Sequence, residues 1–373
     1  MNGITRRRAV VTGLAIGLAL GAVAGQVQAA LPDGRYLYVV CPGIRDYLEF
    51  GGAGILVFDI DHGHRLVKRI ETPASREAKP DNIKGVCASA VTGRLYFTTR
   101  SKLYCLDLDS EQTLWEIAPP NGTDRMSLTP DGRILYVPSF EKDTWNVIDA
   151  DRGALITSIE TRSGAHNTVV SRDGQRMYLG GLKSPILFVA DTRTHQIVQQ
   201  VGPFSGAIRP FTVNGARTRA YICVNDCLGF EIGDLTTGRK LYRVEVQGFA
   251  RGPVKRHGCP SHGIGLTPDE KEVWVVDAFN QRVHVFDNTA EPPKQTVSIA
   301  LREEPGWVTF SLDGKLAYPS TGEVIDTATK QIVAALSDEQ GRPVMSEKMV
   351  EVQWRGGKVV ATGDQFGVGR VVP

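Results

Sequence analysis

A repeat of about 42 residues is the feature that most limits how this chain can fold. Seven times, an aspartate stands where a short apolar segment meets a turn. Aspartate suits this position because its carboxylate can accept a backbone N–H two residues on and close the turn. The seven are Asp59, Asp107, Asp149, Asp191, Asp234, Asp287 and Asp326, at intervals of 48, 42, 42, 43, 53 and 39 residues. Such a period predicts a chain built from repeated units.

A second, independent marker gives the same count. In each repeat an aromatic residue opens a strand-like segment after a turn, and no long helical period interrupts the pattern. A unit of about 42 residues with four short strands has the size of one propeller blade. The two counts therefore predict an all-β, seven-bladed β-propeller of four-stranded blades over residues 30–373. The aromatic residues are Tyr38, Tyr96, Tyr136, Tyr178, Tyr221, Trp274 and Tyr318.

Two segments carry a resemblance to a known family. Leu-Thr-Pro-Asp-Gly-Arg-Ile-Leu-Tyr-Val-Pro at residues 128–138 and Leu-Thr-Pro-Asp-Glu-Lys-Glu-Val-Trp-Val-Val at residues 266–276 resemble the YVTN-type β-propeller repeat. The literal Tyr-Val-Thr-Asn string is absent. The resemblance implies the propeller fold over nearly all of the chain after residue 29. It implies no single function, because such propellers include binding modules, lactonases, lyases, and heavy subunits or haem-d1 domains of redox enzymes.

The ring must also close. The first repeat lacks an opening strand of its own, and residues 349–354 (Met-Val-Glu-Val-Gln-Trp) offer the missing one. We expect this C-terminal strand to join the N-terminal blade, which brings the two ends of the chain together and removes an exposed sheet edge.

Residues 1–29 have the pattern of an export signal. Arg6, Arg7 and Arg8 precede an apolar stretch, and Val27-Gln28-Ala29 supplies the small residues of a cleavage site. The pattern resembles a twin-arginine signal, so we expect export to a bacterial periplasm or beyond, with no membrane span after cleavage. A plain secretory signal and an uncleaved anchor are the alternatives. The rest of the chain carries 40 basic and 41 acidic side chains, which predicts no nucleic-acid partner.

In an exported protein, disulfides can form between cysteines. Cys223 and Cys227 flank a short loop and either pair or remain free thiols, whereas Cys87 and Cys105 are expected to be buried thiols in strands. The other two cysteines are Cys41 and Cys259.

Three loops exceed the regular period, namely residues 41–54, 72–82 and 247–261. In a propeller all three fall on the face where each innermost strand begins. Long loops gathered at one end of a rigid scaffold are where binding sites usually lie. This face is therefore the predicted functional face.

The first residue of each innermost strand is found by counting back twelve residues from the aromatic marker, with Val360 taking that place in the closing repeat. These positions should surround the mouth of the central channel. Their polarity exceeds what strand starts require, and crowded charges shift one another's pKa values, so the ring predicts a functional pocket. A water-filled channel of mutually satisfied charges is the alternative. The positions are Lys84, Asp124, His166, Arg209, His262, Gly306 and Lys348, with Glu347 beside the last.

His166, His262 and Asp124 are the predicted catalytic residues. Two neutral imidazoles and a carboxylate could hold a divalent metal ion and leave positions open for substrate. The same groups could instead act in metal-free acid–base catalysis.

The cations of the ring predict a ligand with a carboxylate or phosphate group. The predicted ligand-binding residues of the ring are Arg209, Lys84 and Lys348. His257 and Cys259, in the third long loop, could add a ligand atom or cover the pocket. The predicted outer wall consists of Arg100, Lys183, Asp226 and Asp277.

The remaining histidines have ordinary interpretations. His62, His64 and His195 fall in exposed turns on the opposite face, and His284 falls in a middle strand with a structural role. The sequence holds no Gly-x-Ser-x-Gly elbow, phosphate-binding loop or Cys-x-x-Cys-His haem motif.

Together these features predict an exported monomer that binds a small anionic molecule at the axial mouth. A metal- or histidine-dependent lyase or hydrolase is the leading hypothesis, because propeller lyases and lactonases with axial metals are the families this pattern most resembles. The first alternative is a non-catalytic envelope scaffold for a protein, peptide or glycan. A redox partner or haem-d1-like domain is the second.

Overall fold

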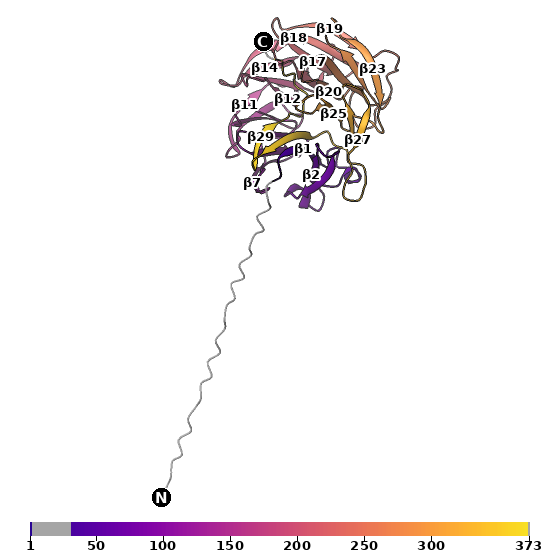
Figure 1. Ribbon diagram of the computed structural model, residues 1–373. Coiled ribbons are helices and arrows are strands. Elements are labelled where there is room, and N and C mark those ends of the chain that lie inside the picture. The colour runs from indigo at the N-terminus through magenta and orange to yellow at the C-terminus, as the bar shows by residue number, and fades with distance from the viewer. Residues whose placement is uncertain (2–30, 372–373) are drawn as a thin grey trace.

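Each repeat folds into an antiparallel sheet, and the sheets stand around a central axis (Figure 1). The computed structural model describes Met1 and residues 31–371. Within this part of the chain there are seven sheets, so the predicted seven-bladed all-β propeller is confirmed. Apart from Met1, the predicted signal segment lies outside the described residues.

The strand bounds follow the repeat closely. The first blade contains β1 (Gly34–Cys41), β2 (Gly54–Asp59), β3 (Arg65–Ile70), β28 (Met349–Arg355) and β29 (Lys358–Thr362). The second contains β4 (Gly85–Ser89), β5 (Arg94–Thr98), β6 (Leu103–Asp107) and β7 (Thr113–Ile117), and the third β8 (Ser127–Leu128), β9 (Ile134–Pro138), β10 (Thr144–Asp149) and β11 (Ala154–Glu160). The fourth contains β12 (Ala165–Val170), β13 (Arg176–Gly181), β14 (Leu187–Asp191) and β15 (Gln196–Val201).

The remaining blades repeat the order. The fifth contains β16 (Ile208–Val213), β17 (Arg219–Val224), β18 (Gly229–Asp234) and β19 (Arg239–Glu245). The sixth contains β20 (Ile264–Leu266), β21 (Glu272–Asp277), β22 (Arg282–Asp287) and β23 (Lys294–Ala300), and the seventh β24 (Val308–Phe310), β25 (Leu316–Pro319), β26 (Glu323–Asp326) and β27 (Ile332–Ala335). Two 3₁₀ turns, η1 (Leu48–Phe50) and η2 (Ala74–Arg76), lie in two of the long loops.

Both sequence markers have a local physical cause. Each marker aspartate ends the third strand of its blade. At Asp149, for example, the carboxylate accepts the backbone N–H groups of Asp151 and Arg152, at 2.9 and 3.0 Å. The seven marker aromatics lie in the second strands and are buried between neighbouring blades. The repeat is therefore a pattern of turns and of inter-blade packing.

The ring closes as predicted, with one addition. β28 pairs antiparallel with β1, so that Val352 lies opposite Tyr36. β29 then adds a fifth strand on the axial side of β28. The sequence pattern predicts Val360 at the position of the marker aromatic in the closing repeat. This prediction is wrong, because β1, which carries Tyr38, already occupies the second-strand position of this blade. Val360 lies in β29 and is exposed.

The segment after β29 crosses the channel at the ends of the innermost strands. The carbonyl of Gly367 accepts the N–H of Leu266 in β20 at 2.9 Å, and the N–H of Gly369 donates to Val213 in β16 at 3.0 Å. Phe366 is buried against Trp307. In Figure 1 the yellow β29 lies in the same blade as the indigo β1, with β28 between them, and the C-terminal end of the chain lies across the ring near β14 and β18. We call residues 363–371 the tail.

Candidate functional site

The starts of the innermost strands meet at a cavity of about 90 Å³. Two of the seven predicted positions lie beside its lining: Asp124 is fully buried next to Lys84, and the Cα of Gly306 approaches His257. A Cβ atom at Gly306 would lie 2.2 Å from the His257 ring, so no side chain fits there. The other five line the cavity, and they are Lys84, His166, Arg209, His262 and Lys348.

All three long loops contribute to this cavity. Arg45 and Arg256 come from the first and third loops and meet over it, because the Arg45 guanidinium donates to the Arg256 carbonyl. The Arg256 guanidinium in turn lies 5.2 Å from the ring centre of Phe50 in the first loop. Asn82 from the second loop and His257 from the third complete the rim.

Arg125 is a lining residue that the sequence did not reveal. Its guanidinium donates to the Glu347 carboxylate and lies 4.9 Å from the Trp307 ring. Counting back from the aromatic marker gives one residue per blade, and in the third blade that residue is Asp124. In a regular strand, side chains alternate between the two faces, so Arg125 would point away from Asp124. Arg125 lies outside regular structure, however, because β8 begins only at Ser127. No sequence signal marks this irregular entry into the strand.

His166 is held as a neutral imidazole. Nη1 of Arg125 lies 3.0 Å from its Nε2, and the side-chain amide of Asn167 lies 2.6 Å from its Nδ1. Because a guanidinium only donates, Nε2 accepts from Arg125, so the ring is neutral and its proton is on Nδ1. Nδ2 of Asn167 faces Nδ1, and a half-turn of this amide would let its buried Oδ1, which has no partner within residues 31–371, accept the proton. Burial holds the pKa of His166 well below its usual value, and the charge of Arg125 adds to this effect.

The predicted metal set of His166, His262 and Asp124 is only partly brought together. Nε2 of His166 lies 3.9 Å from Oδ2 of Asp124, and the two imidazole ring centres lie 6.3 Å apart. Arg125 lies against Nε2 of His166, so a metal ion bound there would have to displace a cation.

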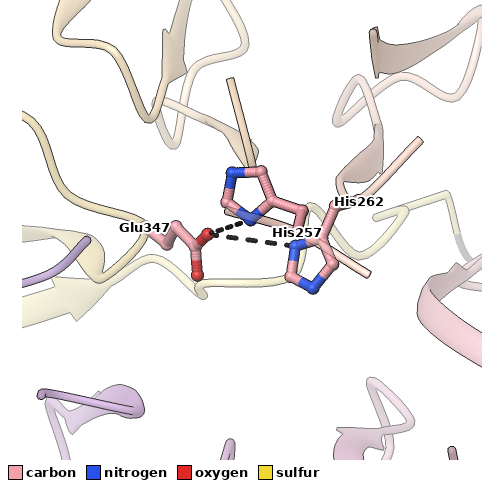
Figure 2. A group of neighbouring side chains, drawn as sticks. All are labelled: His257, His262 and Glu347. Atoms are coloured by element: carbon pink, nitrogen blue, oxygen red, sulfur yellow. Dashed lines mark ion pairs between the residues drawn. The ribbon is translucent and has the colours of Figure 1, made fainter. Parts of the chain in front are cut away.

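A different trio has its ligand atoms closer together. His257, His262 and Glu347 each offer one atom within 4.8 Å of the others, and the trio could hold a metal ion. Figure 2 shows the Glu347 carboxylate facing both rings, with Oε1 at 3.4 Å from Nδ1 of His257 and 3.9 Å from Nδ1 of His262. Burial lowers the pKa of both histidines, so both are neutral and can act as ligands.

Two features of this trio oppose metal binding as the side chains lie. Nδ1 of His262 is 3.1 Å from the Gly306 carbonyl, which can only accept, so this nitrogen carries a proton. The rings of His257 and His262 are stacked, with centres 4.6 Å apart and planes at 22°. Lone pairs in nearly parallel planes do not converge on one ion. A metal ion would therefore require the His262 ring to turn.

Glu347 balances two cations with a single oxygen. Oε2 accepts from Arg125 and from Nζ of Lys348, the latter at 2.7 Å. Burial alone would raise the pKa of Glu347, but Lys348 and Arg125 hold it well below its ordinary value. Burial lowers the pKa of Lys348 to about 7, against the attraction of Glu347. Lys84, 3.5 Å from Asp124, also has its pKa lowered by burial.

Arg209 has no counter-charge. Among residues 31–371 no carboxylate lies within ion-pair distance of its guanidinium, and its buried Nε has no hydrogen-bond partner. The residue is 9% exposed, and its side chain lies against the backbone of Gly258, where a Cβ would meet Nη2. Six basic residues line the cavity against the acids Glu141 and Glu347. A buried cation without a partner is costly unless an anion completes it.

The predicted outer wall lies elsewhere. Arg100 is exposed and paired with Asp81, and Lys183 donates to the backbone of Glu141. Asp226 is exposed and Asp277 is fully buried, where it accepts from Nε2 of His284 at 3.1 Å. None of the four lines the cavity described above.

The other histidines and the cysteines refine the prediction. His62 is exposed, but His64 is buried and bonds the Tyr318 hydroxyl of the neighbouring blade at 3.2 Å, so its prediction as an exposed turn residue is wrong. The blades are close enough there for the ring to reach across. All six cysteines are free, which leaves no disulfide between Cys223 and Cys227. No helix among residues 31–371 has the length and apolar character that a membrane crossing needs.

Comparisons with known proteins identify the fold and no family. No family model matches the chain, and no curated protein matches it. Among solved structures, hydrazine synthase of Kuenenia stuttgartiensis is similar, with 16% sequence identity and a TM-score of 0.56 over 75% of this chain and 86% of that one. At this identity the likeness shows the propeller fold alone.

Proposed function

We propose that this chain is an exported propeller that binds a small anionic molecule in the axial cavity. The observation that carries the proposal is the buried Arg209 guanidinium, which has no carboxylate partner among the described residues and lies in a cavity lined mainly by cations. Arginine matches the geometry of carboxylate and phosphate oxygens, so an anion of this type would supply the missing partner. The pattern of residues 1–29 supports export.

The cavity limits the size of the anion. At about 90 Å³ it is smaller than the roughly 150 Å³ cavity that accommodates benzene in an engineered protein. A phosphate ion or a carboxylate of two or three carbons fits this space. A larger ligand would have to extend between the loops that carry Arg45 and Arg256.

The neutral histidines support acid–base chemistry on such a ligand. His262 carries its proton on Nδ1, so its Nε2 is free to accept one, and Nε2 of the buried His257 has no hydrogen-bond partner. Beside a bound anion they could take up and return a proton, as a lyase or hydrolase of the kind predicted requires. Asp124 is fully buried beside the cavity, burial raises its pKa, and its carboxylate lies 3.5 Å from Nζ of Lys84.

Calorimetric titration with inorganic phosphate and with lactate tests the proposal. We expect binding of at least one of them, and a loss of about tenfold to a hundredfold in affinity in Arg209→Met, because one charge-assisted hydrogen bond is worth about 1.5–3 kcal/mol. Arg100→Met removes an exposed arginine outside the cavity and should leave affinity unchanged. Absence of binding by the wild type, or equal affinity in Arg209→Met, would favour the envelope scaffold.

A metal-assisted site is the second candidate, and the spacing of His257, His262 and Glu347 favours it. When bound there, a divalent ion would supply a Lewis acid to the anion. The same titration, repeated on chelator-treated protein, separates the two candidates. Unchanged affinity supports an anion site made of arginine and lysine alone, whereas affinity lost on chelation and restored by a divalent ion supports the metal.

A further inference from the structure

Two of the six basic residues that line the axial cavity have no acidic partner. Among residues 31–371 no carboxylate lies within ion-pair distance of Arg45 or of Arg209. Glu141, which also lines the cavity, is exposed and forms no ion pair with either arginine. A ligand with a single anionic group can therefore complete only one of the two guanidinium groups. The other four basic residues are paired, Lys84 with Asp124, Arg125 and Lys348 with Glu347, and Arg256 with Glu303.

The Arg45 guanidinium is held at the mouth of the cavity although the residue is exposed. It donates to the backbone carbonyl of Arg256, and the backbone of Arg45 has a φ of 50°, in the left-handed region. The first long loop is fixed on both sides of this contact. Ile44 is buried, with 3% of its surface exposed, and Gly43 forms a parallel bridge with Ser346. A ligand that enters the cavity must therefore pass an arginine whose position is already set.

Arg45 and Arg209 contact the same short segment of the third long loop. The Arg45 guanidinium donates to the carbonyl of Arg256, and Nη2 of Arg209 lies against the backbone of Gly258. Two residues of chain span at most about 7 Å. The residue between them is His257, whose ring lines the same cavity. A short molecule with an anionic group at each end can reach both guanidinium groups, and its carbon chain would then pass His257.

We propose that the ligand of the axial cavity is a short dicarboxylate, with one carboxylate on Arg209 inside the cavity and the other on Arg45 at its mouth. This inference rests on the proposed anion site and specifies its ligand. A cavity of about 90 Å³ holds one carboxylate and little more, so the second carboxylate lies outside it, where Arg45 is exposed. Each guanidinium presents parallel N–H groups that match a carboxylate. Phosphate carries its charge on one centre and cannot span both arginines.

Calorimetric titration of the full chain with succinate and with butyrate tests this proposal. Butyrate has the same number of carbons but a methyl group in place of one carboxylate. At low ionic strength we expect the wild type to bind succinate about tenfold more tightly, because only succinate gains a charge-assisted contact with Arg45. Arg45→Asn should remove this preference and leave the affinity for butyrate unchanged. Asparagine tolerates a left-handed backbone, so the loop can keep its conformation.

Arg172→Asn is the matched control. This exposed arginine lies beside the tail at the opposite end of the channel and has no ion pair within the described part of the chain. Its loss changes the net charge as much as the loss of Arg45 does. The preference for succinate should survive in Arg172→Asn. An equal loss in both variants would mean that the charge of the whole protein, and not Arg45, attracts the second carboxylate.

The titration with lactate separates failure of this inference from failure of the proposed function. If lactate binds with the expected dependence on Arg209 and succinate binds no better than butyrate, the second carboxylate is excluded and the anion site stands. Equal weakening of succinate and butyrate in Arg45→Asn also overturns the inference, because both arginines would then hold one carboxylate. If no anion binds, both proposals fail. The comparison of succinate with butyrate uses the wild type, so it does not depend on the folding of a variant.

Discussion

The two ends of the central channel differ in the chemistry of the groups that fill them. At the mouth, six basic residues, three histidines and two acids line a cavity, and several of their buried polar atoms have no partner. At the other end, the tail fills the channel with backbone hydrogen bonds to β16 and β20 and with the apolar side chains of Phe366 and Val368. The same innermost strands serve both ends.

This difference separates stability from function within one ring. A segment that satisfies its polar groups and buries apolar area contributes free energy to folding. A set of crowded, partly unsatisfied charges costs free energy, and proteins tolerate such a cost mainly where a ligand uses it. Trp307 joins the two ends, because it packs on Phe366 and donates to the tail carbonyl of Gln365 while Arg125 lies on its ring.

The largest expected effect comes from the tail. Phe366→Ala leaves a cavity in a packed cluster, and we expect the free energy of unfolding to fall by about 3 kcal/mol, as for other buried phenylalanines. Phe279→Ala, at a half-exposed position, should cost about 1 kcal/mol or less. Urea unfolding followed by tryptophan fluorescence measures both. Equal losses in the two variants would show that the tail does not stabilise the ring.

The next effect comes from the mouth and depends on pH. His166 and His262 have pKa values well below 6.5 in the folded chain because they are buried. As the pH falls through 6.5, the unfolded chain takes up protons that the folded chain does not, so acid favours unfolding. Between pH 6.5 and the lower pKa of the folded state, each such histidine therefore reduces the free energy of unfolding by about 1.4 kcal/mol for each pH unit of acidification.

His166→Gln should reduce the pH dependence of the free energy of unfolding by the contribution of one histidine, about 1.4 kcal/mol per pH unit. The glutamine amide can keep the hydrogen bond to Arg125 but does not titrate. Urea midpoints measured between pH 7 and pH 5 give the slope for both proteins. Parallel curves for the variant and the wild type would mean that His166 does not carry the acid sensitivity.

The fold could be predicted because its determinants are local and repeated. The aspartate turn and the buried aromatic recur in every blade for the same physical reason, and the period places the start of each innermost strand. Five of the seven axial positions that this count gave line the cavity. Lys348 was found although Val360, from which it was counted, does not occupy the assumed strand. Counting back twelve residues from Val360 in β29 still gives Lys348, which immediately precedes β28.

The residues that escaped prediction lie where the repeat breaks. Arg125 precedes a shortened strand, and Arg256 lies in a long loop, so no period applies to either. Arg100 and Asp277 were predicted to line the outer wall of the cavity. Instead Arg100 pairs with the carboxylate of Asp81, and Asp277 pairs with the imidazole of His284. A sequence pattern gives the position of a residue on a blade. It does not give the partner that decides which way its side chain turns.

The smallest expected effect has the opposite sign to the first. Arg209→Met keeps the length and apolar stem of the side chain and removes a buried charge that has no counter-charge among the described residues. The free energy of unfolding of the ligand-free protein should rise by about 1 kcal/mol, because replacing buried charge by apolar volume is often stabilising. The same substitution should weaken anion binding by about tenfold to a hundredfold, as expected for the loss of one charge-assisted hydrogen bond. Urea unfolding without anion, and again with lactate at saturation, tests both halves. If Arg209→Met is less stable than the wild type in the absence of anion, then the protein itself already satisfies this guanidinium. The mouth and the tail would then differ less than their contacts indicate.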